Sequence, residues 1–430
     1  MRAPSRSGRR RAARPREARG RGLNLDELLR EEWGRLLALL VARYRRLDLA
    51  EDGLADAFEA AARTWPAAGA PDNPPAWLLV AARRRITDRL RAEAVANRTL
   101  PLLAVEADLT EEAQRTMADP GEGGGVADER LRLVLLCAHP SLAPEAAAAL
   151  TLRLVLGVST EDLARLFLVR TTTMAARLTR ARKRLAGASF AVPVGAELAA
   201  RLQVASDVAY LAFTAGYAPG SGSDVLRADV SGEAIRLVRV LRDLLPEADP
   251  EVDALLALML LQHSRRDARV DGGRLVLLPD QDRSRWHADE IAEAVALLTP
   301  LTNAEPAPYL LQALVAAEHA IAPTAGETDW SRIVARYDEL LALADSPVVR
   351  LNRAVAVGEA DGPLAGLAAM DGLTAEVLPG HRLPAARAEL LARATRADEA
   401  RSAYDEAIDT CANEVERAHL EERRSALEAG

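Results

Sequence analysis

The chain has 430 residues, of which 49% are hydrophobic, 27% charged and 3% aromatic, and its formal net charge is −8. This length predicts about three domains, and the composition excludes a chain that is disordered throughout and favours helix packing over sheet. Two cysteines and six scattered histidines exclude a disulfide framework and predict no metal site. Without an apolar run of membrane-spanning length or a signal peptide, we expect a cytoplasmic protein.

Charge is distributed unevenly along the chain. Residues 1–22 carry a net charge of +8, residues 23–190 are neutral overall, and the remaining residues carry −16. The first segment has almost no large apolar residue, so it is predicted to be a disordered basic tail. This tail either adds nonspecific affinity for DNA or is an unstructured start without a role.

Residues 23–92 are predicted to form a unit of three helices. Apolar residues recur at helical spacing from Leu25 to Leu40 and again from Leu54 to Ala61. Pro66 and the proline-rich run at 71–75 are expected to end the second helix, and a third extends from Trp77 to Arg91. One face of the third helix is apolar through Leu79, Ala82, Ile86 and Leu90.

Two charged clusters in this unit suggest contact with partners. The third helix presents Trp77 with five arginines, and such a combination suits an opened DNA strand, because rings stack on unpaired bases and guanidinium groups follow phosphates. The tryptophan could equally belong to the core. The acidic turn Glu51, Asp52 and Asp56 on the second helix could pair with arginines of a protein partner or be a solvated face.

Residues 93–128 are predicted to be a flexible linker, with scattered acids and a glycine-rich run at 121–125. That run lacks the lysine and the preceding strand of a phosphate-binding loop. It therefore predicts no nucleotide site.

Residues 129–187 contain a helix-turn-helix pattern. Thr160 is expected to cap a short helix, a turn follows near 168–170, and Thr171 or Thr172 is expected to cap a second helix. The second helix has a predicted packing face of Met174, Leu178, Ala181 and Leu185. Its basic residues, which suit a helix in the major groove or an ordinary solvated face, are Arg177, Arg180, Arg182, Lys183 and Arg184.

Residues 188–430 are predicted to be helical almost throughout. A short hairpin is expected over 269–278, and helix pairs are expected from 308–322 and 330–344 onward. When the chain is compared with itself at an offset of 34 residues, identical residues align in helices that are predicted to correspond. The aligned pairs are Ala354 and Ala388, Ala369 and Ala403, and Asp371 and Asp405. This period is typical of tetratricopeptide (TPR) repeats and favours an α-solenoid, although small residues can coincide by chance in an alanine-rich chain.

In this order the motifs resemble one family, the extracytoplasmic-function (ECF) sigma factors of the sigma-70 family. The runs AEDGLADAF at 50–58 and DNPPAWL at 72–78, with Trp65 and Pro66 between them, are similar to region two, and 130–186 is similar to region four. The runs DGGRLVLLPDQDRSRW at 271–286 and SPVVRLNRAVA at 346–356 resemble a subgroup with a long TPR-like C-terminal extension. The fold class predicted is all-α.

The resemblance implies a dissociable subunit of bacterial core RNA polymerase that recognises promoter DNA and needs no cofactor. Region two would grip the polymerase through Glu51, Asp52, Asp56 and Phe58. It would receive a flipped −10 base in the loop 67–73, and its DNA contacts would be Asp72, Asn73, Trp77, Arg83, Arg84, Arg85 and Arg89. Region four would read the −35 duplex through Thr171, Thr172, Thr173, Arg177, Arg180 and Lys183.

Some positions depart from the family pattern. Ala55-Asp56 replaces the usual Gln-Glu pair, and Gly53 costs about 1 kcal/mol of helix stability relative to alanine, which predicts weaker polymerase binding. Ala175 and Ala176 stand where polar residues are common, so Arg177 and Arg180 would carry more of the reading. Arg170 replaces a frequent proline of the turn.

Three hypotheses concern the extension. Its acidity could mask basic region four through an intramolecular contact, or it could be a scaffold that only adds stability. Alternatively, a segment of the extension is needed for activity, with the candidate residues Asp280, Asp282, Arg283, Arg285 and Trp286.

Other functional classes fit less well. The sequence has no nucleophile with a base and no metal cluster, so it does not predict an enzyme. A repressor or activator with a helix-turn-helix and a TPR-like sensor domain is the alternative, and a pure TPR scaffold would bind neither DNA nor polymerase. Binding to core polymerase separates these classes from a sigma factor.

Overall fold

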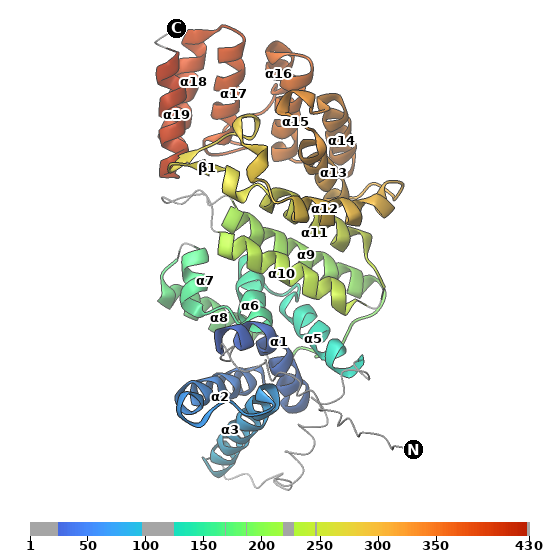
Figure 1. The fold of residues 1–430 in the computed structure, drawn as a ribbon, viewed down its shortest axis with the longest axis vertical. Helices are drawn as coiled ribbons and strands as arrows, with labels where there is room; N and C mark the ends of the chain where they lie inside the picture. The colour runs from blue at the N-terminus through green and yellow to red at the C-terminus, as the bar shows by residue number, and fades with distance from the viewer. Residues whose placement is uncertain are drawn as a thin grey trace, which may run out of the picture.

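The computed structural model describes residues 25–96, 124–167, 169–185, 187–217, 228–245 and 247–427. These residues form helices and one two-stranded sheet, which confirms the predicted all-α class with a short hairpin. Figure 1 shows an elongated stack that begins with α1–α3 at one end and finishes with α17–α19 at the other. The predicted tail over 1–22 and the middle of the predicted linker lie outside the described residues, but the linker's two ends are helical.

The first three helices form one unit. These helices are α1 (Leu25–Tyr44), α2 (Leu47–Ala68) and α3 (Pro74–Ala96). Gly53 lets α2 approach α3 closely, because a Cβ there would lie 2.6 Å from Cγ1 of Ile86. The predicted helical cost of this glycine is therefore offset by packing, with Leu54, Leu79 and Ala82 buried around it.

Both helix ends near the α2–α3 turn differ from the prediction. α2 continues through Pro66 to Ala68, since a proline so close to the helix end removes only one late hydrogen bond. α3 begins before Trp77, because the Asn73 side chain accepts a hydrogen bond of 3.1 Å from the Ala76 amide and prolines are favourable in a first turn.

A second unit contains the helix-turn-helix. Its helices are α5 (Gly124–Cys137), α6 (Pro144–Leu156), α7 (Thr160–Leu166) and α8 (Thr171–Leu185). The predicted packing face of α8 is confirmed, since Met174, Leu178, Ala181 and Leu185 are all buried.

The helix caps in this unit were predicted one or two positions too late. Ser159 rather than Thr160 caps α7, because its hydroxyl accepts a hydrogen bond of 3.0 Å from the Asp162 amide. In α8 the Arg170 carbonyl accepts the first helical hydrogen bond, at 3.0 Å from the Met174 amide. Thr171 and Thr172 therefore lie inside the helix.

Helix α1 of the first unit also packs against α5 and α6 of the second unit. A Cβ on Gly34 would lie 2.1 Å from the backbone oxygen of Val155 in α6, and a Cβ on Gly157 would lie 2.9 Å from the Trp33 ring. Such close approach is available only to glycine at these two positions. One hydrophobic core consequently extends through both units and onward to α13.

Three further helices cover the second unit. α9 (Ala196–Tyr217) and α10 (Ala228–Leu244) pack against α5 and α6, and α11 (Pro250–His263) lies behind them. Arg201 and Arg236 join the layers by donating hydrogen bonds of 3.0 and 3.1 Å to the backbone oxygens of Leu135 and Leu156. α11 is buried on nearly all sides, as its almost continuous apolar sequence requires.

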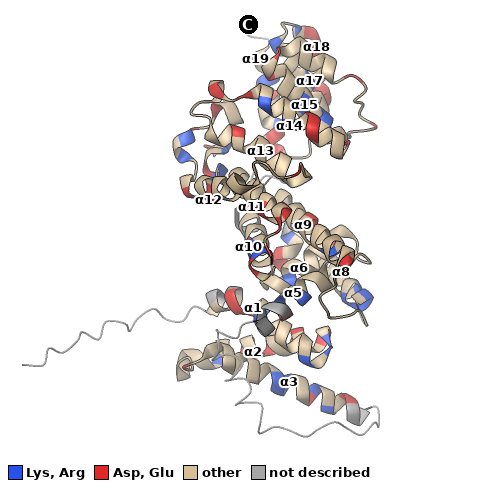
Figure 2. Ribbon diagram, turned by 90° about the vertical axis from the view of Figure 1, so that its right-hand side faces the viewer, with Lys and Arg blue, Asp and Glu red and all other residues tan. Residues whose placement is uncertain are grey.

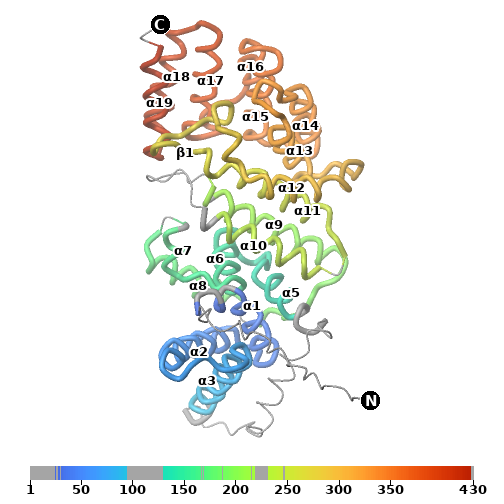
Figure 3. Tube along the Cα trace, viewed as in Figure 1, coloured from blue at the N-terminus to red at the C-terminus, as the bar shows by residue number. Residues whose placement is uncertain are grey.

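An insert follows α11. Strands β1 (Val270–Asp271) and β2 (Arg274–Leu275) pair antiparallel through a Gly272–Gly273 turn with positive φ at both glycines. The short 3₁₀ helices η2 (Leu278–Asp280) and η3 (Arg283–Arg285) lead into α12 (Ala288–Leu298) and η4 (Thr299–Leu301). Because β2 contacts α19, the insert lies beside the end of the chain, as Figure 3 traces.

The remaining helices pack mainly on their neighbours in the chain. They are α13 (Pro308–Ile321), α14 (Trp330–Leu343), α15 (Pro347–Ala360), α16 (Pro363–Ala369), α17 (Arg382–Arg393), α18 (Ala397–Thr410) and α19 (Glu414–Ala426).

The helices expected over 308–322 and 330–344 are confirmed, but the offset of 34 matches only in part. Ala354 and Ala388 are both buried, in α15 and α17. Asp371 lies beyond the end of α16, whereas Asp405 lies within α18, so this pair is not in matching helices. Among the described residues, none belongs to a helix that is long and apolar enough to cross a membrane.

Candidate nucleic-acid interface

A cleft opens between the end of α2 and the start of α3. It has a volume of about 700 Å³, and the residues expected at the −10 strand that line it are Asp72, Asn73, Trp77, Arg84 and Arg85. The half-buried Trp77 ring packs edge-on against Trp65, with the centroids 5.4 Å apart. One side of the Trp77 ring thus packs against Trp65 and another lines the cleft, while its role toward DNA stays a prediction. Arg84 and Arg85 are exposed at its rim.

Two other arginines expected at this strand are placed differently. Arg83 is only 4% exposed, so it belongs to the interior of the helical unit rather than to the surface of the cleft. Arg89 bridges α3 to α2, with its guanidinium 2.8 Å from Asp52 and 3.0 Å from Asp56. Two predicted polymerase contacts and one predicted DNA contact are therefore joined in one ion-pair group on the surface.

The acidic turn of α2 is divided between surface and interior. Asp52 is exposed and Asp56 is half-buried beside it. Phe58 is 5% exposed and packs 5.8 Å from the Trp33 ring, so it is a core residue and not an available partner contact. Glu51 is also 5% exposed.

The Glu51 carboxylate lies in an ion cluster formed by the two helical units. Its oxygens are 2.8 Å from Nε of Arg153 on α6 and 2.6 Å from a terminal nitrogen of Arg182 on α8. Arg153 also covers the Trp33 ring at 5.4 Å and donates a hydrogen bond to the Val158 carbonyl. A buried carboxylate is stable only with such partners.

A buried cysteine borders this cluster. Cys137 at the end of α5 is fully buried, and burial raises the pKa of its thiol, with the nearby Glu51 charge adding to the rise. The thiol is therefore protonated and unreactive at neutral pH.

The basic face of α8 is largely open. Thr171, Thr172, Thr173, Arg180 and Lys183 are exposed, and Figure 2 shows the basic residues of α8 at the edge of the molecule. Arg177 is half-buried, with its guanidinium 5.9 Å from the centre of the Phe167 ring. Helix α8 packs on α6 and α7, whereas α9 and α10 pack on α5 and α6. Among the described residues, the main contacts of α9 and α10 with the second unit are therefore made to α5 and α6.

In the candidate segment of the extension, residues 280–286, some side chains hold the segment to α13 and others are exposed. Arg283 donates hydrogen bonds of 2.7 and 2.8 Å to the carbonyls of His319 and Ala322, and its guanidinium lies 4.4 Å from the buried Trp286 ring. Asp282 caps η3 by accepting hydrogen bonds from Ser284. Asp280 and Arg285 are exposed.

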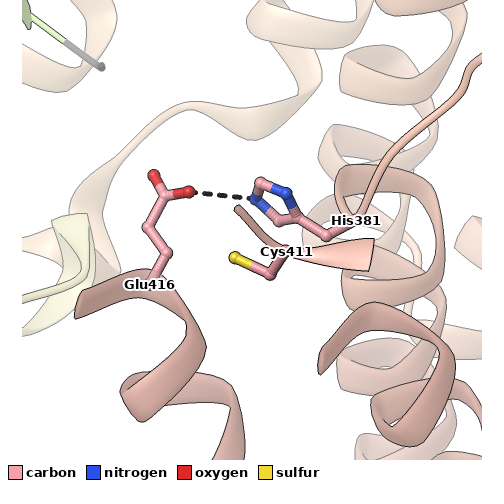
Figure 4. A group of neighbouring side chains, drawn as sticks. All are labelled: His381, Cys411 and Glu416. Atoms are coloured by element: carbon pink, nitrogen blue, oxygen red, sulfur yellow. Dashed lines mark ion pairs between the residues drawn. The ribbon is translucent and has the colours of Figure 1, made fainter. Parts of the chain in front are cut away.

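One group of side chains that could hold a metal ion occurs among the described residues. Figure 4 shows His381, Cys411 and Glu416, whose ligand atoms lie within 4.8 Å of one another. Each already has a protein partner, because His381 pairs with Glu416 at 3.0 Å and the Cys411 thiol donates to the Asn413 carbonyl. Burial also raises the pKa of Cys411, which disfavours the thiolate that a metal requires.

Sequence reasoning missed this group and a cavity beside it. The cavity has a volume of about 380 Å³ and lies between β2, α15, α17 and α19, over the apolar side chains of Leu275, Leu351 and Leu420. Its acids are already paired, for example Glu389 with Arg423 at 2.7 Å. Its lining comes from segments far apart in the chain, so no local pattern could have indicated it.

Known protein families match the second unit and part of the chain that follows it. Residues 132–185 match the family model for sigma-70 region 4, and residues 201–301 match a family of unknown function, DUF6596. An uncharacterized protein of Rhizobium meliloti (strain 1021) is 39% identical over 388 residues, which is 89% of this chain and 91% of that protein. No solved structure matches.

Proposed function

Since the chain belongs to the same family as this Rhizobium meliloti protein and carries a sigma-70 region 4, we propose that it is an RNA polymerase sigma factor of the ECF type. It would bind bacterial core RNA polymerase, recognise a promoter and start transcription, without enzymatic chemistry of its own. The observation that carries this proposal is the match to region 4 over a helix-turn-helix whose second helix is open on its basic face.

Duplex reading is assigned to α8. The N-terminal threonines, Arg180 and Lys183 are exposed together, as a helix in the major groove needs. Guanidinium groups pair with guanine edges or phosphates, and hydroxyls bind phosphates or base edges. The DNA affinity of such a surface falls steeply with salt.

Strand opening is assigned to the cleft between α2 and α3. A base that leaves the helical stack would enter beside Trp77, while Arg84 and Arg85 would follow the strand backbone. Stacking and phosphate contacts would repay the cost of unpairing. The volume of the cleft is compatible with one base.

The helices beyond α8 are proposed to be a TPR-like extension that regulates the sigma factor in the cytoplasm. Support comes from successive helices that pack on one another and from the close contact of α15 and α16, where a Cβ on Gly366 would lie 2.7 Å from Cα of Gly358. The same helices α9 and α10 that begin this extension cover α5 and α6.

Run-off transcription tests the proposal. The full chain should be used, because cutting near residue 190 would uncover the apolar faces of α5 and α6 that α9 and α10 bury. Purified core polymerase with DNA from upstream of the operon of this chain should give specific transcripts only when the protein is added. A protein that binds this duplex but neither binds core polymerase nor gives a transcript would instead be a helix-turn-helix repressor or activator.

A further inference from the structure

We propose that the free chain is closed by an ion lock, in which α6 and α8 occupy the Glu51 side of α2 and so exclude core polymerase from that side. The lock is defined as Glu51, Arg153 and Arg182. This inference rests on the proposed function and on the polymerase contacts that the family resemblance implies for Glu51, Asp52 and Asp56 of α2.

The contacts show that the Glu51 side of α2 is occupied. Glu51 is 5% exposed, and both of its carboxylate oxygens are taken by arginines that lie 102 and 131 positions further along the chain. Around the lock, α1 packs against α5 and α6, with Gly34 pressed on the Val155 backbone. Arg45 at the end of α1 donates a hydrogen bond of 3.1 Å to the Phe190 carbonyl beyond α8. A partner cannot reach Glu51 unless the two units separate.

Because the lock is made of charged groups, a partner with suitable charges would favour the separation of the two units. A carboxylate buried between two guanidinium groups loses its hydration, and the arginines replace the water as its partners. On opening, Glu51 regains water or meets cationic groups of another protein. A polymerase surface that offers such groups would therefore compete directly with Arg153 and Arg182.

The lock acts on one partner surface and spares the other. Arg182 of α8 pairs with Glu51, but Thr172, Arg180 and Lys183 on the same helix are exposed. On α2 itself, Asp52 and Asp56 pair with Arg89 and lie outside the lock. The closed chain can thus meet duplex DNA while its polymerase face remains partly covered.

Substitution of the two arginines tests the lock in the full chain. Arg153→Gln or Arg182→Gln leaves Glu51 with one partner and should tighten binding to core polymerase about threefold, whereas the double substitution should tighten it about tenfold or more. Small-angle X-ray scattering should show a larger radius of gyration for the double variant. Arg165→Gln is the matched control, because it removes the same charge from the same unit at an exposed pair with Asp162.

The outcomes separate the lock from the function beneath it. Unchanged polymerase affinity in a folded double variant, with transcription by the wild-type chain, would overturn the lock alone. No polymerase binding by any variant or by the wild-type chain would overturn the sigma-factor proposal and the lock with it.

A measurement on the unmodified chain covers the case in which the double variant does not fold. Hydrogen–deuterium exchange should become about tenfold faster in the amides of the α6–α7 turn near Val158 when core polymerase binds, because Arg153 is then released from Glu51. Exchange in α2 should become slower. Unaltered exchange near Val158 in the polymerase complex would contradict the lock.

Discussion

The two ends of this elongated molecule are held together in different ways. Helices α1–α13 share one continuous hydrophobic core, in which α1 of the first unit packs against α5 and α6 of the second. From α13 onward the described residues form three small clusters, each made by helices that are neighbours in the chain. A change in the first part should therefore affect both partner surfaces, whereas a change in the second part should stay local.

The contrast also explains where partner surfaces are available. In the first part, the same shared core that orients the open basic face of α8 brings Arg153 and Arg182 onto Glu51. In the second part, a cavity lies between β2, α15, α17 and α19, and its charged groups already pair with one another, as Glu389 of α17 does with Arg423 of α19.

The largest expected effect comes from the contact of α1 with α6. Gly34→Ala would place a Cβ 2.1 Å from the Val155 backbone oxygen, and neither backbone can move without disturbing the core. We expect a loss of about 3 kcal/mol in the free energy of unfolding of the first part, with the transition of the last helices unchanged. Differential scanning calorimetry of the full chain should show two transitions, of which only that of the first part moves.

The control for Gly34 is Gly232→Ala in α10. A Cβ at this position meets no atom within 4 Å, so the substitution should be neutral or stabilise the helix by up to about 1 kcal/mol. An equal loss of stability at both glycines, or a loss spread over both transitions, would contradict the contrast between a shared core and local clusters.

The next effect separates two arginines on the same helix. Arg180→Ala should weaken binding to promoter duplex by about 2 kcal/mol, because an exposed guanidinium is removed from the reading face. Arg182→Gln should leave duplex binding nearly unchanged, because this arginine is engaged with Glu51. Fluorescence anisotropy at constant salt measures both. Equal losses would show that Arg182 also contacts DNA.

A smaller loss of stability is expected when the pH is lowered, and it arises from His319. His319 on α13 lies 5.1 Å from the Trp330 ring, and burial, together with the nearby Arg265 and Arg283, lowers the pKa of His319 to about 4. The unfolded chain binds this proton near pH 6.5, so the stabilising contribution is complete above that pH and is lost as the pH falls toward 4. At pH 5 the loss should be about 1 to 2 kcal/mol.

His319→Phe tests this dependence. The variant keeps a ring beside Trp330 and removes the titration, so the melting temperature of the last helices should fall less between pH 7.5 and pH 5 than in the wild-type chain. Other acid-sensitive carboxyls, such as Glu290, whose pKa is lowered by His263, act equally in both proteins. Parallel pH curves for the two proteins would exclude His319 as a source of acid sensitivity.

Local patterns predicted what depends on local spacing. The buried face of α8 follows from apolar residues three and four positions apart, and the hairpin follows from two glycines between short apolar runs. The environment of Glu51 could not be predicted in this way, because an acidic turn has the same sequence whether it faces water or an arginine 102 residues away. Phe58 was misassigned for a related reason, since an apolar residue beside charged ones fits both a partner surface and the core.

The sites of the extension show the same limit. His381, Cys411 and Glu416 meet only because the start of α17, the end of α18 and the start of α19 lie together, and their spacing in the chain has no metal-ligand period. Arg283 and Arg285 share one short motif, yet one binds two backbone carbonyls and the other is exposed. Their orientation depends on where α13 lies, which the motif itself does not contain.

The smallest effect on stability is expected from Arg285, and comparison with Arg283 tests how this segment is held in the extension. Arg285→Ala should change the free energy of unfolding by less than about 0.5 kcal/mol, because its contact with Asp271 is exposed and 3.5 Å long. Arg283→Ala should cost about 2 kcal/mol, since two backbone carbonyls lose their donor and the buried Trp286 ring loses its cover. Thermal unfolding measures both losses.

If the segment is needed for activity, run-off transcription should fall with Arg285→Ala while the melting temperature is unchanged. Wild-type transcription by Arg285→Ala, with a loss only in Arg283→Ala, would instead place the role of this segment in packing against α13.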